Sequence, residues 1–190
     1  NLGRLANLAK EIESKYQINL QFVSGGNSSS IDLMMSGNIP KGINNLRLGE
    51  AIVLGRETAY GKNLKGTYQD AFKLVCEIVE LKEKPSLPIG EVGVDAFGNK
   101  PVYEDKGIIK RAIVAIGKQD IDITSIHPID SQIEILGASS DHMILNISEC
   151  DKEYNIGDKV EFSIKYGALV STCTSKYVNK EIVYNSKLAY

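Results

Sequence analysis

The stretch INLQFVSGGNSSSIDLMMSGNIPKGINNLRLGEAIVLG, residues 18–55, decides the fold of the N-terminal part of the chain. Its first segment, residues 18–26, is rich in β-prone residues and ends in two glycines, which predicts a buried strand followed by a tight loop. Residues 28–38 predict a short helix that stops at a glycine. Residues 43–55 predict a second strand.

A helix pattern precedes this stretch, because apolar residues recur at steps of three and four through residues 1–16. The order helix, strand, helix, strand, with loops of a few residues, is typical of a parallel α/β sheet or barrel.

The pattern changes after residue 66. Residues 71–81, AFKLVCEIVEL, alternate apolar and polar side chains, as a half-buried strand does. Short β-branched segments bounded by turn residues then predict further strands at 108–117, 133–140, 142–148, 158–164 and 168–174. We therefore expect an α/β piece over residues 1–66 and a mostly antiparallel β domain over residues 67–190.

The composition is that of an ordinary globular protein, with 190 residues, 43% of them hydrophobic, and a net charge of −2. This near-neutral charge argues against nucleic-acid or membrane-surface partners, and no apolar run reaches the ~20 residues that span a bilayer. Cys76, Cys150 and Cys173 lie far apart, which indicates reduced thiols in a cytoplasmic protein.

Two segments of the first part could bind a ligand. SGGNSSS, residues 24–30, has the glycines, hydroxyls and amides that suit an anion such as phosphate, although a simple turn and helix cap would look the same. Arg47 lies among apolar residues, so it needs either a partner, a cavity or a strand end in solvent.

Titratable residues gather in the predicted β domain at Lys118, Asp120, Asp122, His127, Asp141 and His142. Neighbours in a strand point to opposite faces, so we expect Asp141 and His142 not to touch. The two histidines lie fifteen positions apart, which is a poor metal-ligand pattern, and we predict no metal site.

Together these segments resemble the alanine-racemase-like family of pyridoxal-phosphate enzymes, and most closely its ornithine racemase branch. The resemblance implies the last strands and helices of a TIM-type (β/α)8 barrel, followed by a C-terminal antiparallel β domain. It also implies that pyridoxal 5'-phosphate is held by Asn27, Ser28, Arg47, Gly49, Glu50 and Tyr184, with Tyr177 as the alternative to Tyr184. An arginine on the ring nitrogen keeps that nitrogen unprotonated and favours reversible proton removal, as in racemisation.

The family's acid/base tyrosine lies in a Gly-Tyr-x-Asp-Gly-Tyr segment, and the matching residues here are Gly117-Lys118-Gln119-Asp120. Lys118 is therefore the candidate second base by position, and His142 is the candidate by chemistry. Asp120 or Asp141 would support that base.

The family's Schiff-base lysine lies on the first barrel strand, and we expect it upstream of Asn1 in a parent about twice this length. The resemblance implies a homodimer whose sites are shared between subunits, an amino-acid substrate (ornithine-like or alanine-like), and an inactive isolated fragment. Two alternatives stay open: a metal- and pyridoxal-phosphate-dependent D-amino-acid dehydratase or aldolase, and a non-catalytic module for dimerisation or cofactor binding.

Overall fold

The computed structural model describes residues 1–91, 93–94, 98 and 104–184. The chain divides into two compact units, Asn1–Ala71 and Phe72–Tyr190, and each is described by itself.

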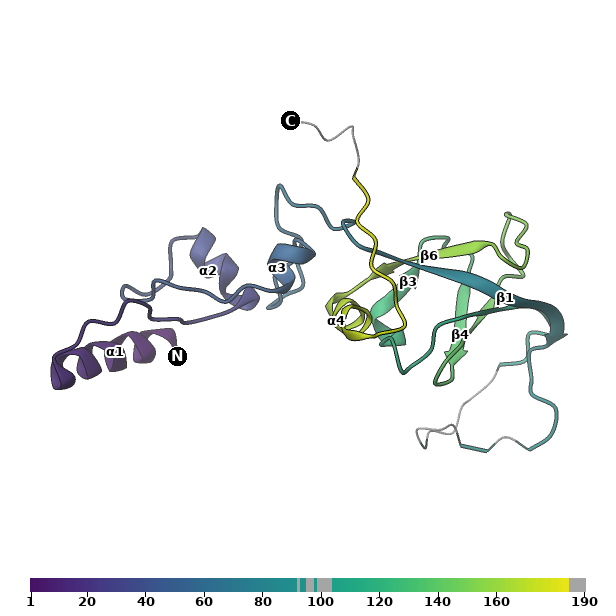
Figure 1. Cartoon of the computed structure of the whole chain (residues 1–190), viewed down its shortest axis with the longest axis horizontal. Helices are drawn as coiled ribbons and strands as arrows, with labels where there is room; N and C mark the ends of the chain where they lie inside the picture. The colour runs from purple at the N-terminus through teal and green to yellow at the C-terminus, as the bar shows by residue number, and fades with distance from the viewer. Residues whose placement is uncertain (92, 95–97, 99–103, 185–190) are drawn as a thin grey trace. The chain divides into compact units, whose positions relative to one another are not determined.

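The first unit contains three helices and a pair of extended segments (Figure 1). Helix α1 spans Leu2–Tyr16, as its apolar spacing predicts, and α2 spans Ile31–Met35 directly after a 3-10 turn at Ser28–Ser30. Helix α3, Glu50–Val53, falls inside a stretch expected to be a strand, so that expectation is wrong for these residues. The amides of Ile52 and Val53 bond the Gly49 carbonyl instead of a neighbouring strand.

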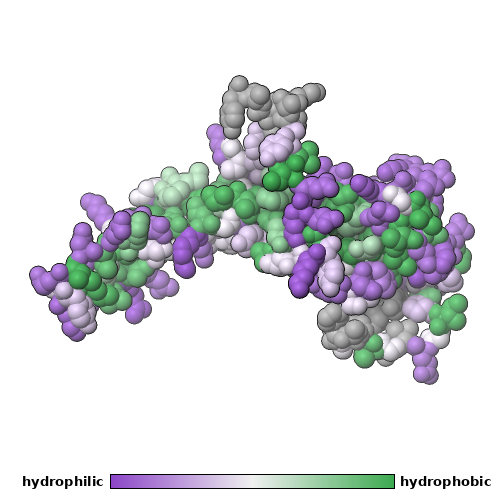
Figure 2. Space-filling view, viewed as in Figure 1, coloured by the Kyte–Doolittle hydropathy of each residue, from purple (hydrophilic) through white to green (hydrophobic). Residues whose placement is uncertain are grey.

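The predicted strands at 18–26 and 43–47 are only extended segments, joined by one parallel bridge between Ser24 and Asn45. The first is also not buried, since Ile18 and Phe22 are 49% and 65% exposed. A parallel strand is normally covered on both faces, and the exposure of these two side chains departs from that pattern. Figure 2 shows such hydrophobic residues, in green, on the visible surface of the first unit.

The second unit is a six-stranded sheet in which every neighbouring pair is antiparallel, which confirms the predicted antiparallel β domain. The strand order is β3-β6-β1-β2-β5-β4. The strands are β1 (Lys73–Pro85), β2 (Ile108–Val114), β3 (Ile126–Pro128), β4 (Glu134–Ala138), β5 (Met143–Asn146) and β6 (Lys159–Ile164).

The alternation of β1 explains the core of this sheet. Leu74, Cys76 and Ile78 point inward while their neighbours are exposed, as a strand with one buried face requires. The N-terminal half of β1 pairs with β6 and its C-terminal half pairs with β2, with a register shift between Ile78 and Glu80. β1 therefore belongs to both halves of the sheet.

Helix α4, Tyr166–Thr174, corrects the prediction of a strand at residues 168–174. Ala168, Leu169 and Thr172 are buried on one side of the helix, and their spacing is helical rather than alternating. The Thr172 hydroxyl donates to the Ala168 carbonyl at 2.8 Å, a bond that lets a threonine remain inside a helix. Packing overrides the β preference of the branched residues here.

Candidate active site

Two loops that are distant in sequence meet in the first unit. The Gly25 amide donates to the Asn45 carbonyl, and the Arg47 amide donates to the Gly26 carbonyl. These bonds align the two extended segments in parallel, so the loops that follow them lie at the same edge. This is the edge at which parallel α/β folds bind their ligands.

The Ser28 side chain joins the two loops. It is buried, and its Oγ accepts hydrogen bonds from the amides of Gly49 and Ala51, each at 3.2 Å. A hydroxyl that accepts twice still has its own proton to donate, so Ser28 can bind an anion such as phosphate. Asn27 has a different role, because its Oδ1 accepts from the amide and hydroxyl of Ser29 and caps the 3-10 turn.

The glycines of this loop allow the close approach. Gly26 has a φ of 111°, and a Cβ there would lie 2.6 Å from the Ser30 hydroxyl oxygen. A Cβ on Gly25 would lie 2.9 Å from Ile43 Cδ1. A side chain at Gly26 would be strained by the positive φ and would displace the Ser30 side chain, and one at Gly25 would displace the Ile43 side chain.

Arg47 and Glu50 lie near Gly49 in the chain, and the Gly49 amide is one of the two that donate to Ser28. Arg47 is exposed, and its guanidinium makes no hydrogen bond or ion pair within the part of the chain that the structure describes. Glu50 is half-buried in the first turn of α3. The buried Ser28 hydroxyl, the Glu50 amide and the Arg47 guanidinium form a donor set that fits a phosphate and a ring nitrogen.

Glu57 is a second organising residue of the first unit, and the sequence analysis missed it. Its side chain is only 1% exposed. The carboxylate accepts hydrogen bonds from the amides of Ala59, Tyr60 and Lys62, at 2.7–3.0 Å. The only available signal was an acid four residues before a glycine in ETAYG, because the local side-chain-to-backbone bonds that sequence reasoning expects come mainly from Ser, Thr, Asn and Asp.

The Glu57 loop should respond to acid. The bond from the Lys62 amide, with those from Tyr60 and Ala59, lowers the pKa of this carboxyl although burial opposes them. A lowered folded-state pKa gives stability that is present above the unfolded value and lost as pH falls through the folded value. We expect the amide NMR signals of Ala59, Tyr60 and Lys62 to shift together, with a midpoint below the ordinary value of 4.5. In Glu57→Gln this joint shift should vanish; a midpoint at or above the ordinary value would contradict the assignment.

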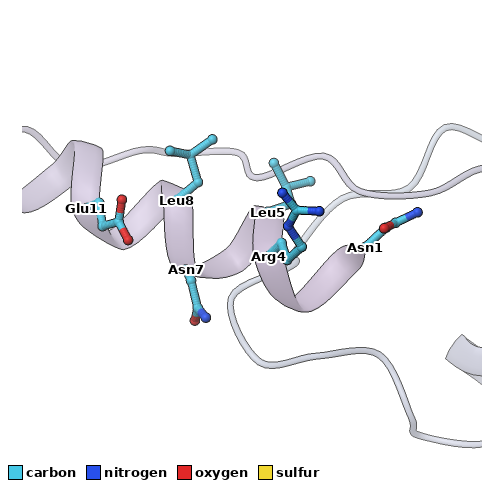
Figure 3. A pocket seen from close by; sticks show the side chains of 6 residues that line it. All are labelled: Asn1, Arg4, Leu5, Asn7, Leu8 and Glu11. Carbon is cyan, nitrogen blue, oxygen red and sulfur yellow. The ribbon is translucent and has the colours of Figure 1, made fainter.

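A surface hollow of about 620 Å3 lies along α1 (Figure 3). Its lining residues are Asn1, Arg4, Leu5, Asn7, Leu8 and Glu11. All belong to one helix or its cap, and none belongs to the loops around Ser28. A single helix face brings no convergent chemistry together, so we place the candidate site at the Ser28 loops instead.

In the second unit, the two candidate bases lie on adjoining turns. Lys118 belongs to the turn that follows β2, and His142 ends the turn between β4 and β5. The Lys118 amide donates to the Ser139 carbonyl at 2.8 Å, and the Gln119 amide donates to the Ser140 carbonyl at 3.0 Å. Gly117 permits this contact, because a Cβ there would lie 2.4 Å from the Asp141 amide nitrogen.

Asp141 and His142 touch, which corrects the expectation that they point apart. Asp141 Oδ1 lies 3.0 Å from His142 Nδ1. The expectation assumed strand geometry, but β5 begins only at Met143, so both residues lie in the turn. Ser139, which the sequence analysis did not single out, contacts both side chains: its Oγ lies 2.9 Å from Asp141 Oδ1 and 2.8 Å from His142 Nδ1.

Asp120 and the C-terminal tyrosines have other surroundings. Asp120 is buried, and its Oδ1 accepts a hydrogen bond from the Ser175 hydroxyl at 2.6 Å. Asp120 therefore fixes the 117–121 turn to the residue after α4. Tyr177 and Tyr184 are 78% and 87% exposed.

Within residues 1–91, 93–94, 98 and 104–184, no group of three or more His, Cys, Asp or Glu side chains is placed to hold a metal ion. Over the same ranges, the helices are too short or too polar to cross a membrane.

Solved structures define the class of the fold. The chain superposes on alanine racemase from Bartonella henselae, which has covalently bound pyridoxal phosphate, with a TM-score of 0.52 and 21% identity, covering 88% of this chain and 45% of that one. It superposes on D-threonine aldolase from Filomicrobium marinum with a TM-score of 0.54 and 14% identity, covering 90% and 39%. At these identities the likeness concerns the fold alone, and no protein-family model matches the chain.

Two racemases are similar to this chain over nearly its whole length. The chain is 58% identical to ornithine racemase of Acetoanaerobium sticklandii over 96% of its length, and 41% identical to lysine racemase of Thermotoga maritima over 93%. It spans 52% and 49% of these two proteins, or about half of each. The resemblance predicted from the sequence is confirmed: the chain is a relative of amino-acid racemases.

Proposed function

We propose that this chain is part of a pyridoxal-phosphate-dependent amino-acid racemase. The observation that carries the proposal is the 58% identity to an ornithine racemase over 96% of the chain. The names of the two relatives support an L- or D-amino acid with a terminal amino group as substrate, in preference to an alanine-like one. Residues 1–66 would form the end of a (β/α)8 barrel, and the remainder its β domain.

The Ser28 loops would hold the cofactor. Ser28 and the Glu50 amide would bind the phosphate, joined by the Gly49 amide once it leaves Ser28 Oγ. Asn27 would hold the turn in shape, and Arg47 would face the ring nitrogen. Tyr184 would reach the phosphate on binding. Pyridoxal 5'-phosphate supplies an electron sink for the pair left on Cα when its proton is removed.

The proton would be exchanged by two bases on opposite faces of Cα. One is the Schiff-base lysine expected outside this chain, and the other is His142 or Lys118. We propose a cytoplasmic homodimer in which the β domain of one subunit supplies this second base to its partner's site.

Racemisation by the whole protein tests this function. Single enantiomers of ornithine, lysine, serine and alanine are incubated with cofactor-loaded protein, and we expect ornithine or lysine to lose optical activity. Ser28→Ala should weaken cofactor affinity about tenfold or more, because a hydrogen bond to a charged group is lost. Its control is Ser36→Ala, an exposed hydroxyl at the end of α2.

A different result would point to another reaction. Constant optical rotation with bound cofactor would refute the racemase. Stoichiometric zinc or manganese, together with cleavage of a D-3-hydroxyamino acid, would instead favour the aldolase whose fold this chain shares.

A further inference from the structure

We propose that His142 is the second base, acting through Nε2, and that Ser139 and Asp141 are the positioning residues that hold it. This inference rests on the proposed racemase function and decides a question which that function leaves open. In the Ser139–His142 turn, the side chains of Ser139, Asp141 and His142 lie within 3.0 Å of one another.

The contacts fix which ring nitrogen carries the proton. The bonds from His142 and then Ser139 lower the pKa of the Asp141 carboxyl, so at neutral pH Asp141 is ionised and can only accept hydrogen bonds. Ser139 donates its hydroxyl proton to Asp141 Oδ1, and its oxygen is then left to accept. Nδ1 therefore faces two acceptors and must be the protonated nitrogen.

The other ring nitrogen, Nε2, then carries the lone pair. The His142 side chain is 42% exposed, and its contacts with Ser139 and Asp141 are made through Nδ1, not through Nε2. A ring nitrogen with a free lone pair is what a general base requires. The tautomer set by Ser139 and Asp141 therefore makes His142 the group that takes a proton from Cα.

The backbone of Lys118 helps to hold the Ser139–His142 turn. Its amide, with that of Gln119, donates to the carbonyls of Ser139 and Ser140. The Ser139 amide also donates to the His142 carbonyl at 2.9 Å, closing the turn on itself. The 117–121 turn thus holds the backbone from which the imidazole projects.

The Cα–H bond breaks, its electron pair stays with the substrate, and the proton moves to the Nε2 lone pair to give an imidazolium. Asp141 stabilises that positive charge. In the reverse direction the imidazolium returns the proton to the same face, while the base on the opposite face completes racemisation.

Solvent-deuterium exchange on the whole cofactor-loaded protein tests the assignment. His142→Asn keeps an N–H near the Nδ1 position and removes Nε2. We expect racemisation to fall by about 10²–10⁴-fold, while one enantiomer still exchanges its α-proton with retention through the opposite base. Ser139→Ala and Asp141→Asn should lower racemisation by about tenfold to a hundredfold and leave that exchange unchanged, whereas Ser131→Ala, at an exposed serine of the same unit, should match the wild type.

A second measurement does not depend on activity. In ¹⁵N-histidine spectra of the whole protein, the His142 signals are those that disappear in His142→Asn. Where the ring is neutral, we expect His142 to carry its proton on Nδ1, and Ser139→Ala or Asp141→Asn to shift it toward the Nε2–H form.

Three outcomes overturn the proposal while the racemase stands: wild-type racemisation in His142→Asn, the one-sided exchange pattern in Lys118→Gln instead, or an Nε2–H tautomer in the wild type. If the wild type neither racemises nor exchanges any substrate, the proposed function itself fails, and the tautomer measurement still stands alone.

Discussion

Gly117→Ala should lower racemisation by about a hundredfold, because a displacement of about 1 Å in a catalytic group has an effect of that size. The added Cβ would lie 2.4 Å from the Asp141 amide nitrogen and 2.5 Å from the Ser140 carbonyl carbon and oxygen. These are backbone atoms that no rotamer change can move away, so the 139–142 turn must shift. The overpacking should also destabilise the β domain by about 1–3 kcal/mol.

Rates from the deuterium-exchange assay and the His142 ¹⁵N shifts measure this effect together. Gly93→Ala is the matched control, since a Cβ there meets no atom of the described residues within 4 Å. A Gly117→Ala variant with wild-type racemisation and an unchanged His142 spectrum would show that the two turns do not hold each other.

Phe162→Ala should destabilise the second unit by about 3–5 kcal/mol, the usual result of removing a buried aromatic ring. Phe162 is 0% exposed in β6 and is paired with Leu74 of β1. Its loss leaves a cavity where β6 pairs with β1. Denaturant unfolding followed by circular dichroism should show a lower midpoint with little change in slope.

Phe72→Ala supplies the comparison for this variant. Phe72 precedes β1 and is 37% exposed, so its removal should change the unfolding free energy by about 1 kcal/mol or less. Equal losses for the two variants would mean that the sheet core can collapse around the missing ring.

The alternation of residues 71–81 predicted β1 because each inward residue meets the same core. Residues 168–174 were wrongly predicted to form a strand because β-branched side chains favour strands on average. Only the packed fold shows that Ala168, Leu169 and Thr172 share one buried face. The contact between Asp141 and His142 was missed for a similar reason. Its geometry depends on where a strand starts, which hydrophobic patterning locates only to within a few residues.

Ser28 could be picked out from the sequence because a glycine pair and a helix start surround it. Its bonds to Gly49 and Ala51 could not, since they join loops that only the parallel alignment of two segments brings together. Ser139 and Glu57 could not be predicted from the sequence for a further reason. Both act through turn hydrogen bonds, which leave almost no trace in hydrophobicity or spacing.

β1 has a consequence for how the second unit folds. Its pairing with β2 joins segments separated only by one connection, whereas its pairing with β6 joins residues from opposite ends of the unit. Because distant pairings form slowly, the β1-β2-β5-β4 half should assemble early in refolding and the β6-β3 half should dock later. The His142 turn lies in the early half, so its geometry would be set before the sheet is complete.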